Sequence, residues 1–157
     1  MRNILRLFLF ALILTSGCIS HDVEESTISC NCDNPAKQLD VANSMILGEW
    51  TWISTGFHNR GSESYYETPQ NTNSQITYKF SADTLTIIKN GTNIYKERYS
   101  VGHFGDITNT PTDTSLVVKY IHPDTSIGVS MLFVDNNCMK LVNSYNDAGG
   151  VILLKRK

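Results

Sequence analysis

Four cysteines carry the most distinctive chemistry in this sequence of 157 residues. Cys18 directly follows an apolar run, Cys30 and Cys32 flank a single residue, and Cys138 stands alone near the C-terminal end. A thiol can be acylated, oxidised to a disulfide or used as a metal ligand. Which of these fates applies depends on the compartment that the chain reaches.

The N-terminal segment predicts export. Arg2 and Arg6 precede an unbroken apolar run from residue 7 to residue 14. A bilayer-spanning helix needs about 20 apolar residues, so this run is typical of a secretory signal peptide instead. Residues 14–18, LTSGC, resemble the lipobox of bacterial lipoproteins. The resemblance implies that residues 1–17 are removed and that Cys18 is the lipid attachment site, a membrane anchor carrying acyl chains such as palmitate. The alternative is an ordinary leader, cut elsewhere, with a free Cys18.

The remaining cysteines predict one disulfide. An exported chain meets an oxidising compartment, in which thiols pair. A bridge between Cys30 and Cys32 would be strained because only one residue separates them. We therefore predict that one of these two, left open here, pairs with Cys138. A metal site formed by the three cysteines and a histidine is the alternative, but no second paired motif accompanies them, so we expect no metal and no cofactor.

Residues for catalysis are present without the motifs that usually arrange them. Ser100, His103 and Asp106 have the types of a nucleophile, a base and its orienter, but no Gly-x-Ser-x-Gly elbow or glycine-rich phosphate loop occurs. The acidic residues are spread through turns and form no evident pair for glycoside hydrolysis. No two histidines have the spacing of metal ligands on one element. We expect no catalytic residues and no enzymatic activity.

Charge and composition separate a tether from a folded domain. Removal of residues 1–17 leaves 11 basic and 15 acidic residues, a formal net charge of −4, which disfavours nucleic acid as a partner. Residues 19–34 contain acidic side chains and no Lys or Arg, a composition that cannot bury enough apolar surface to fold. We predict a leader over residues 1–17, a lipidated cysteine and acidic flexible tether over 18–34, and one domain over 35–157.

The domain is predicted to be all-β after one short helix. Asn34 as N-cap and Pro35 at the first helical position predict a helix that ends near Ile46. Alternation of period two then predicts eight strands, at residues 48–54, 74–80, 83–89, 93–101, 115–121, 128–134, 138–143 and 150–156. Tight turns favour an up-and-down antiparallel meander, and closure into a barrel removes its two edges. A two-sheet sandwich is the alternative.

A family resemblance rests on the ends of this predicted barrel. A short helix, then Gly48-Glu49-Trp50 at the start of the first strand, and Arg156 in the last strand resemble the lipocalin superfamily, in particular the lipocalin-like domains of bacterial lipoproteins. The resemblance implies that Trp50 packs at the closed end of the barrel beneath Arg156. It also implies structural roles for Gly48, Trp50 and Arg156, since a guanidinium over an indole gains roughly 0.5 to 2 kcal/mol.

Alternation divides each strand into two faces, and we expect the bulkier face to point inward. The predicted inward residues are Trp50, Trp52, Ile76, Tyr78, Phe80, Leu116, Val118, Tyr120, Val129, Met131 and Phe133, with Thr51, Thr77, Lys79, Lys119 and Ser130 facing solvent. Five of them are the predicted ligand-binding residues: Trp52, Tyr78, Phe80, Tyr120 and Phe133. Residues 55–73 are expected to be a loop, either a lid with Phe57, Tyr65 and Tyr66 over the mouth or a mobile solvated segment.

Two functions of different classes follow from these predictions. The first is a lipid-anchored barrel that binds a small apolar or amphipathic molecule at the cell envelope of a Gram-negative bacterium, most simply at the outer membrane, on its periplasmic or surface face. The second is a protein-interaction or inhibitor module with a filled barrel, which binds through its loops. The predicted partners are the membrane, through the N-terminal lipid, and a small hydrophobic ligand; no protein partner is identified.

Overall fold

The computed structural model describes residues 30, 32–59, 65–121, 127–143 and 148–157. The predicted leader, the predicted lipid attachment site Cys18 and most of the predicted tether lie outside these residues. In the part of the chain that is described, no helix has the length and apolar character needed to cross a membrane.

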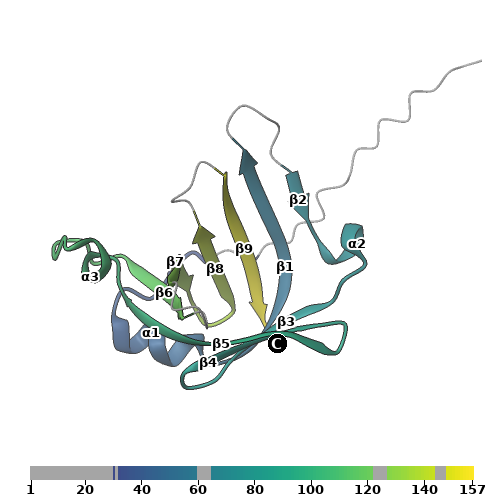
Figure 1. Cartoon of the computed structure of the whole chain (residues 1–157), viewed down its shortest axis with the longest axis horizontal. Helices are drawn as coiled ribbons and strands as arrows, with labels where there is room; N and C mark the ends of the chain where they lie inside the picture. Colours follow the sequence, from purple (N-terminus) through teal and green to yellow (C-terminus); the bar gives the residue numbers. More distant parts are fainter. Residues whose placement is uncertain (1–29, 31, 60–64, 122–126, 144–147) are drawn as a thin grey trace, which may run out of the picture.

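Eight antiparallel strands form one closed barrel, as the alternation predicted (Figure 1). Strands that follow one another are hydrogen-bonded, and the ring closes where β1 pairs with β9, from Trp50 opposite Arg156 to Asn59 opposite Ala148. The strands of the ring are β1 (Gly48–Asn59), β3 (Ile76–Phe80), β4 (Thr84–Lys89), β5 (Thr92–His103), β6 (Leu116–Ile121), β7 (Ile127–Val134), β8 (Cys138–Asn143) and β9 (Ala148–Arg156). The closure confirms the barrel and excludes the sandwich.

The prediction of a loop over residues 55–73 was wrong for the described residues of that range, and residues 60–64 lie outside them. β1 continues to Asn59, and a short strand, β2 (Tyr65–Glu67), pairs with it outside the ring. A single turn of helix, α2 (Pro69–Thr72), follows β2. The register of β1 against β9 shifts between Trp52 and Ser54, and such a bulge interrupts the alternation by which a strand is recognised. The sequence pattern therefore indicates the end of β1 at the bulge, although the strand itself continues beyond it.

The helix α1 (Leu39–Ile46) begins later than the sequence predicted. Asn34 and Pro35 were expected to start it, but both lie outside the helix. The backbone N–H of Ala36 instead donates to the carbonyl of Val134, at 2.8 Å. Because this hydrogen bond holds Ala36 against β7, the helix begins only after Ala36, at Leu39.

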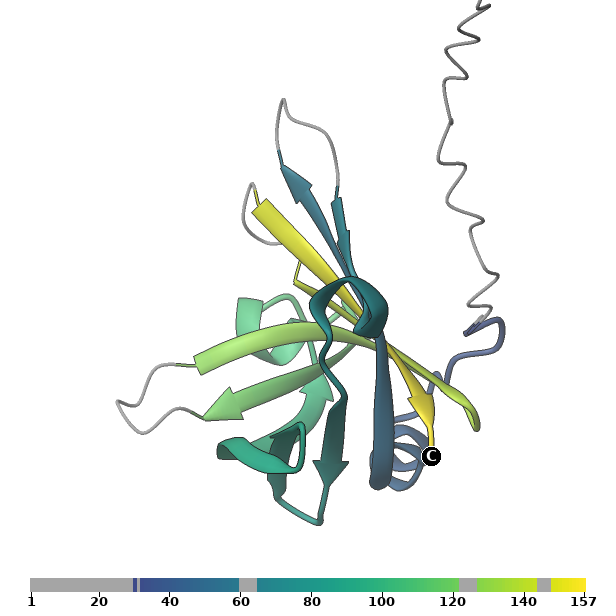
Figure 2. The ribbon, with the colours of Figure 1, turned by 90° about the vertical axis from the view of Figure 1, so that its right-hand side faces the viewer.

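One end of the barrel is sealed where α1, the start of β1 and the end of β9 come together (Figure 2). The Trp50 indole is fully buried, and its N–H donates to the carbonyl of Ile46 at 2.8 Å. The Arg156 guanidinium lies 4.1 Å from the centre of the Trp50 ring. It also donates to three backbone carbonyls, those of Met45, Leu47 and Asn136. This is the arrangement that the family resemblance implied for Trp50 and Arg156.

The core fills the barrel next to this sealed end. Its largest buried side chains come from α1 and every strand of the ring, and they are Ile46, Trp50, Trp52, Phe80, Leu85, Tyr99, Leu116, Val118, Leu132, Val134, Met139, Leu141 and Leu154. Burial of one such side chain contributes about 1.5 to 3 kcal/mol. Phe80 and Tyr99 meet edge to face with their ring centres 5.1 Å apart. The Tyr99 hydroxyl donates to the carbonyl of Ser81 at 2.6 Å, which places this pair close to the sealed end.

The faces of β7 are the reverse of those predicted. The residues that point inward are Ser130, Leu132 and Val134, which are 1%, 4% and 1% exposed. Val129, Met131 and Phe133 are therefore on the outer wall and only half-buried. The prediction was wrong because both faces of β7 are largely apolar. The size of the side chains therefore did not distinguish the inner face from the outer one.

Candidate ligand site inside the barrel

Three tyrosines point into the barrel from β3, β5 and β6. Tyr78, Tyr95 and Tyr120 all pack against the core. On their strands, Tyr78 and Tyr95 lie further from the sealed end than Phe80 and Tyr99. Burial raises the pKa of Tyr78 to about 12, and the neighbouring Tyr120 adds to the rise. Burial also raises the pKa of Tyr120 to about 12. Both phenols are therefore neutral hydrogen-bonding groups across the physiological pH range.

A carboxylate stands among these phenols. The Tyr95 hydroxyl donates to Oε2 of Glu97 at 2.5 Å. Glu97 lies between Tyr95 and Tyr99 on the inward face of β5, opposite the buried Leu85 of β4. Burial raises the pKa of Tyr95, and its hydrogen bond to Glu97 raises it further, because a negative charge opposes ionisation of the phenol.

A second polar chain crosses from β6 to β8. The Ser130 hydroxyl donates to Oδ1 of Asn143, and the Ser130 side chain offsets part of the burial-driven rise in the pKa of Tyr120. Trp52 joins the polar interior from β1, where its indole N–H donates to Oγ1 of Thr55 at 2.9 Å. Polar groups from four strands thus extend from the buried Ser130 to the exposed Asn143.

Four of the five predicted ligand-binding residues lie inside the barrel. Tyr78 and Tyr120 are two of the three inward-facing tyrosines described above. Trp52 and Phe80 are 2% exposed and form part of the packed core. Phe133 does not belong with them. It lies on the outer wall, where the ammonium of Lys140 is 5.8 Å from its ring centre.

Sequence reasoning missed Tyr95, Glu97, Ser130 and Asn143. A signal for Glu97 was present, because Tyr95, Glu97, Tyr99 and Val101 alternate along one strand and an acidic residue among inward aromatic residues is unusual. Ser130 had no such signal, since its strand was assigned the wrong inner face.

The three residue types considered for catalysis are not arranged as a triad. The Asp106 carboxylate accepts from the backbone N–H of His103 at 3.3 Å, whereas Nδ1 of that histidine contacts the carbonyl of Thr114 at 3.1 Å. Asp106 lies in α3 (Gly105–Thr108), in the connection between β5 and β6. Ser100 is exposed and pairs with Lys119 on the neighbouring strand. Two of the remaining histidines, His21 and His122, fall outside the described residues.

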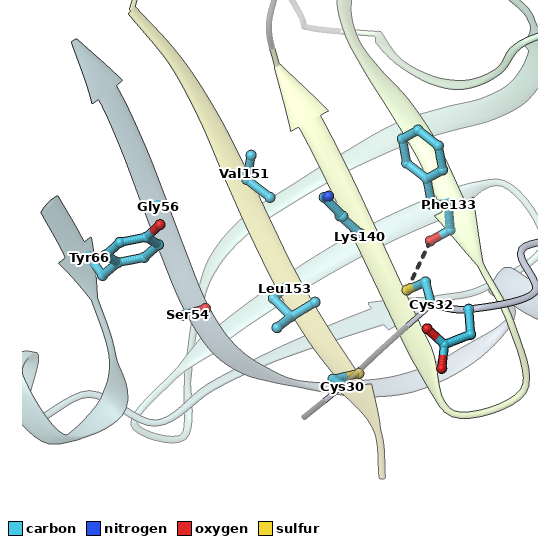
Figure 3. Close-up of a pocket in the computed structure, with 10 residues that line it drawn as sticks. Cys30, Cys32, Ser54, Gly56, Tyr66, Phe133, Lys140, Val151 and Leu153 are labelled. Carbon is cyan, nitrogen blue, oxygen red and sulfur yellow. Dashed lines mark hydrogen bonds between the residues drawn. The ribbon is translucent and has the colours of Figure 1, made fainter. Parts of the chain in front are cut away.

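The three cysteines of the described chain lie together on the outer wall of the barrel, where Figure 3 shows Cys30 and Cys32. The thiol of Cys138 donates to the carbonyl of Cys30 at 3.2 Å, and the thiol of Cys32 donates to the carbonyl of Phe133 at 3.7 Å. All three are free thiols. In the part of the chain that is described, no group of three or more Cys, His, Asp or Glu side chains is arranged to hold a metal ion. The disulfide to Cys138 stays a prediction.

No family model, curated protein or solved structure matches this chain. The half-buried side chains of Tyr78, Tyr95, Tyr120 and Glu97 can contact the hydrogen-bonding head group of a small molecule. Trp52 and Phe80, each 2% exposed, are covered by the packed core.

Proposed function

We propose that this chain is a lipid-anchored protein of a Gram-negative cell envelope whose barrel binds a small amphipathic molecule. The observation that carries the proposal is the Tyr95–Glu97 pair among inward-facing phenols. A polar group taken out of water costs roughly 1 to 3 kcal/mol unless it is hydrogen-bonded, and a charge costs more. Tyr95 and Glu97 are half-buried and hydrogen-bonded to each other, so a ligand that covered them would have to supply a polar group that matches theirs.

The anchor and the family assignment rest on the sequence. Cys18 follows lipobox-like residues, and acylation there would hold the barrel at a membrane through a tether of acidic composition. The closed eight-stranded barrel is compatible with a lipocalin-like domain. The Trp50–Arg156 contact at the sealed end supports the same assignment.

The head group that suits this interior is a hydrogen-bond donor, and most simply an amine. Glu97 supplies carboxylate acceptors. The faces of Tyr78 and Tyr120 attract a cation, which contributes about 0.5 to 1 kcal/mol at an exposed site and about 2 kcal/mol when desolvated. An anionic head group would meet the repulsion of Glu97. The charge of the head group therefore distinguishes amphipathic amines, which should bind, from amphipathic anions, which should bind more weakly.

Tryptophan fluorescence of the full chain in phospholipid nanodiscs tests the proposal. Trp50 and Trp52 are the only tryptophans, and both lie inside the barrel. We expect saturable quenching by octylamine and weaker quenching by octanoate, which has the same chain and the opposite charge. Glu97→Gln should weaken octylamine binding about tenfold, which corresponds to about 1.4 kcal/mol.

Glu49→Gln is the matched control, because Glu49 lies on the outer wall in ion pairs with Lys79 and Lys157. It should leave octylamine binding unchanged. Equal weakening by both variants would assign the effect to net charge. Absence of saturable binding by either probe, together with bare protein in native mass spectrometry, would overturn the small-molecule proposal.

A protein-interaction module is the second candidate, and the exposed tyrosines of β2 favour it. Tyr65 and Tyr66 are 48% and 59% exposed, and Tyr65 stacks on Phe57 with ring centres 4.6 Å apart. Aromatic residues held rigidly at a surface are typical of interface hot spots. Loss of a co-purifying envelope protein from Tyr65→Ser and Tyr66→Ser variants, with amphiphile binding absent in the parent, would favour this function.

A further inference from the structure

A groove on the outer wall of the barrel ends at the cysteines. It has a volume of about 440 Å³ and runs over the outward faces of β1, β9, β8 and β7 (Figure 3). Its apolar walls are formed mainly by Tyr66, Phe133, Val151 and Leu153. Tyr66 lies directly over Gly56, where an added Cβ would come within 2.8 Å of its ring. This groove is separate from the polar interior, because its residues alternate with those that face the core.

The three thiols differ in their access to the groove. Cys30 and Cys32 line it and are half-buried, whereas Cys138 is 1% exposed. The Cys138 thiol donates to the backbone carbonyl of Cys30 at 3.2 Å, and the neighbouring Cys30 and Cys32 side chains both add to the rise in its pKa. The Cys30 thiol also donates to the carbonyl of Leu154, at 3.3 Å. Burial raises the pKa of all three thiols, most strongly that of Cys138.

One buried thiol next to two accessible ones has a simple chemical consequence. Either Cys30 or Cys32 can form the disulfide with Cys138, and whichever does so leaves the other as a thiol that faces the groove. A thiolate near a disulfide can also exchange with it without any external oxidant. Of Cys30, Cys32 and Cys138, the thiol that a disulfide to Cys138 leaves unpaired is therefore one of the two that line the groove.

Two charges define what fits beside this thiol. Asp33 and Lys140 both line the groove, and both are exposed side chains. A carboxylate and an ammonium at one site complement a small molecule that carries both charges. Amino-acid thiols and their disulfides have this character, since each half bears an ammonium and a carboxylate.

The geometry points to a covalent site for small zwitterionic thiols: Cys30 and Cys32 share Cys138 as their disulfide partner, and the one left over is S-thiolated in the outer groove. Cystine, the disulfide of cysteine, is the probe that represents this class. The site does not depend on what the barrel interior binds.

The chemistry balances with cystine as the oxidant. The thiolate of Cys30 or Cys32 attacks one sulfur of cystine, the S–S bond breaks, and one cysteine leaves as a thiolate that takes up a proton. The Cys138 thiolate then attacks the protein sulfur of the mixed disulfide and displaces a second cysteine. Two protein thiols have become one disulfide, and one cystine has become two cysteines. A second cystine modifies the remaining thiol and releases one more cysteine.

Mass-spectrometric mapping of the full chain tests this site. The protein is extracted from envelopes in mild detergent, reduced with a phosphine, treated with cystine and quenched with acid. We expect one disulfide that includes Cys138, and one cysteinyl group on Cys30 or Cys32. Each of the variants Cys30→Ser and Cys32→Ser should still form the disulfide to Cys138 and should carry no cysteinyl group.

Two results would overturn the shared-partner idea. One is a disulfide to Cys138 that forms in only one of the two serine variants while both variants unfold at the parent temperature. The other is first modification at Cys138. In the folded protein we expect Cys30 and Cys32 to react at least about tenfold faster than Cys138, and in urea all three should react alike.

Replacement of Lys140 tests recognition of the zwitterion. Lys140→Gln should slow modification by cystine relative to cystamine, which carries amines and no carboxylate, by about threefold, as expected for one charge near 6 Å in a water-like medium. The ratio of the two rates cancels any change in the thiol pKa. Lys96→Gln, an exposed lysine on β5 that does not line the groove, is the control. An unchanged ratio in Lys140→Gln would overturn the charge recognition.

Discussion

The contacts of Arg156 at the sealed end predict a large stability loss for a substitution that keeps the charge. In Arg156→Lys, a single ammonium replaces a planar group that donates to the carbonyls of Leu47 and Asn136, at 3.0 and 2.7 Å, and to that of Met45. Two of these three hydrogen bonds are lost, at about 1 kcal/mol each. The guanidinium lies 4.1 Å from the centre of the Trp50 ring in the parent protein, and the weaker stacking of an ammonium there lowers the unfolding free energy by about 1 kcal/mol more.

The expected loss is therefore about 3 kcal/mol of unfolding free energy, or a fall in Tm of about 10 °C for a domain of this size. Urea titration of the full chain in detergent, followed by tryptophan fluorescence, measures it directly, because Trp50 reports on the same end of the barrel. Arg98→Lys is the matched control. The side chain of Arg98 is 73% exposed, and its ion pair with Asp83 is long, at 3.9 Å, so its replacement should change stability by less than about 0.5 kcal/mol.

A loss below about 1 kcal/mol for Arg156→Lys would refute the reasoning. It would mean that water satisfies the three carbonyls when the guanidinium is absent, and that α1 does not depend on the strand ends to close the barrel.

Three further predictions concern other parts of the chain. Tyr78 and Tyr120 should ionise near pH 12, as measured by phenolate absorbance. Their pKa in the folded protein is raised above the unfolded value of about 10. Their contribution to stability is therefore complete below pH 10 and is lost as the pH rises from 10 through 12. Gly105→Ala should lower the unfolding free energy by about 2 kcal/mol or more, because its Cβ would lie 2.3 Å from the carbonyl oxygen of Thr110; a neutral result in thermal denaturation would show that this loop can move aside. Cys18→Ser should abolish metabolic labelling with palmitate, and retained label would contradict lipidation at Cys18.

Much of the fold could be predicted because it follows from local patterns. The alternation of polar and apolar residues located all eight strands of the ring, and for β8 (Cys138–Asn143) the predicted and observed bounds are the same. Tight turns between strands favour antiparallel neighbours, and bare edges favour closure. The helix start at Asn34 was wrong, because a hydrogen bond from Ala36 to a strand about a hundred residues away outweighed the local capping signal.

The site could be predicted only in part, because alternation separates two faces without saying which is inside. Where one face is clearly bulkier, as for Tyr78 and Phe80, the inward side was correct. Where both faces are apolar, as in β7, the choice failed, and Ser130 and Phe133 exchanged places. Only the register of neighbouring strands decides such a case.

By itself, then, the sequence determined the eight strands of the ring and their order, since these depend on periodicity and on short connections along the chain. The family resemblance implied the roles of Trp50 and Arg156 at the sealed end. The tertiary structure alone decided that Tyr95 and Glu97 meet Tyr78 and Tyr120 inside the barrel, and that Cys30 and Cys32 lie beside Cys138 outside it. These groups come from segments far apart in the chain. Their contacts arise from the closure and tilt of the whole ring, which no local pattern encodes.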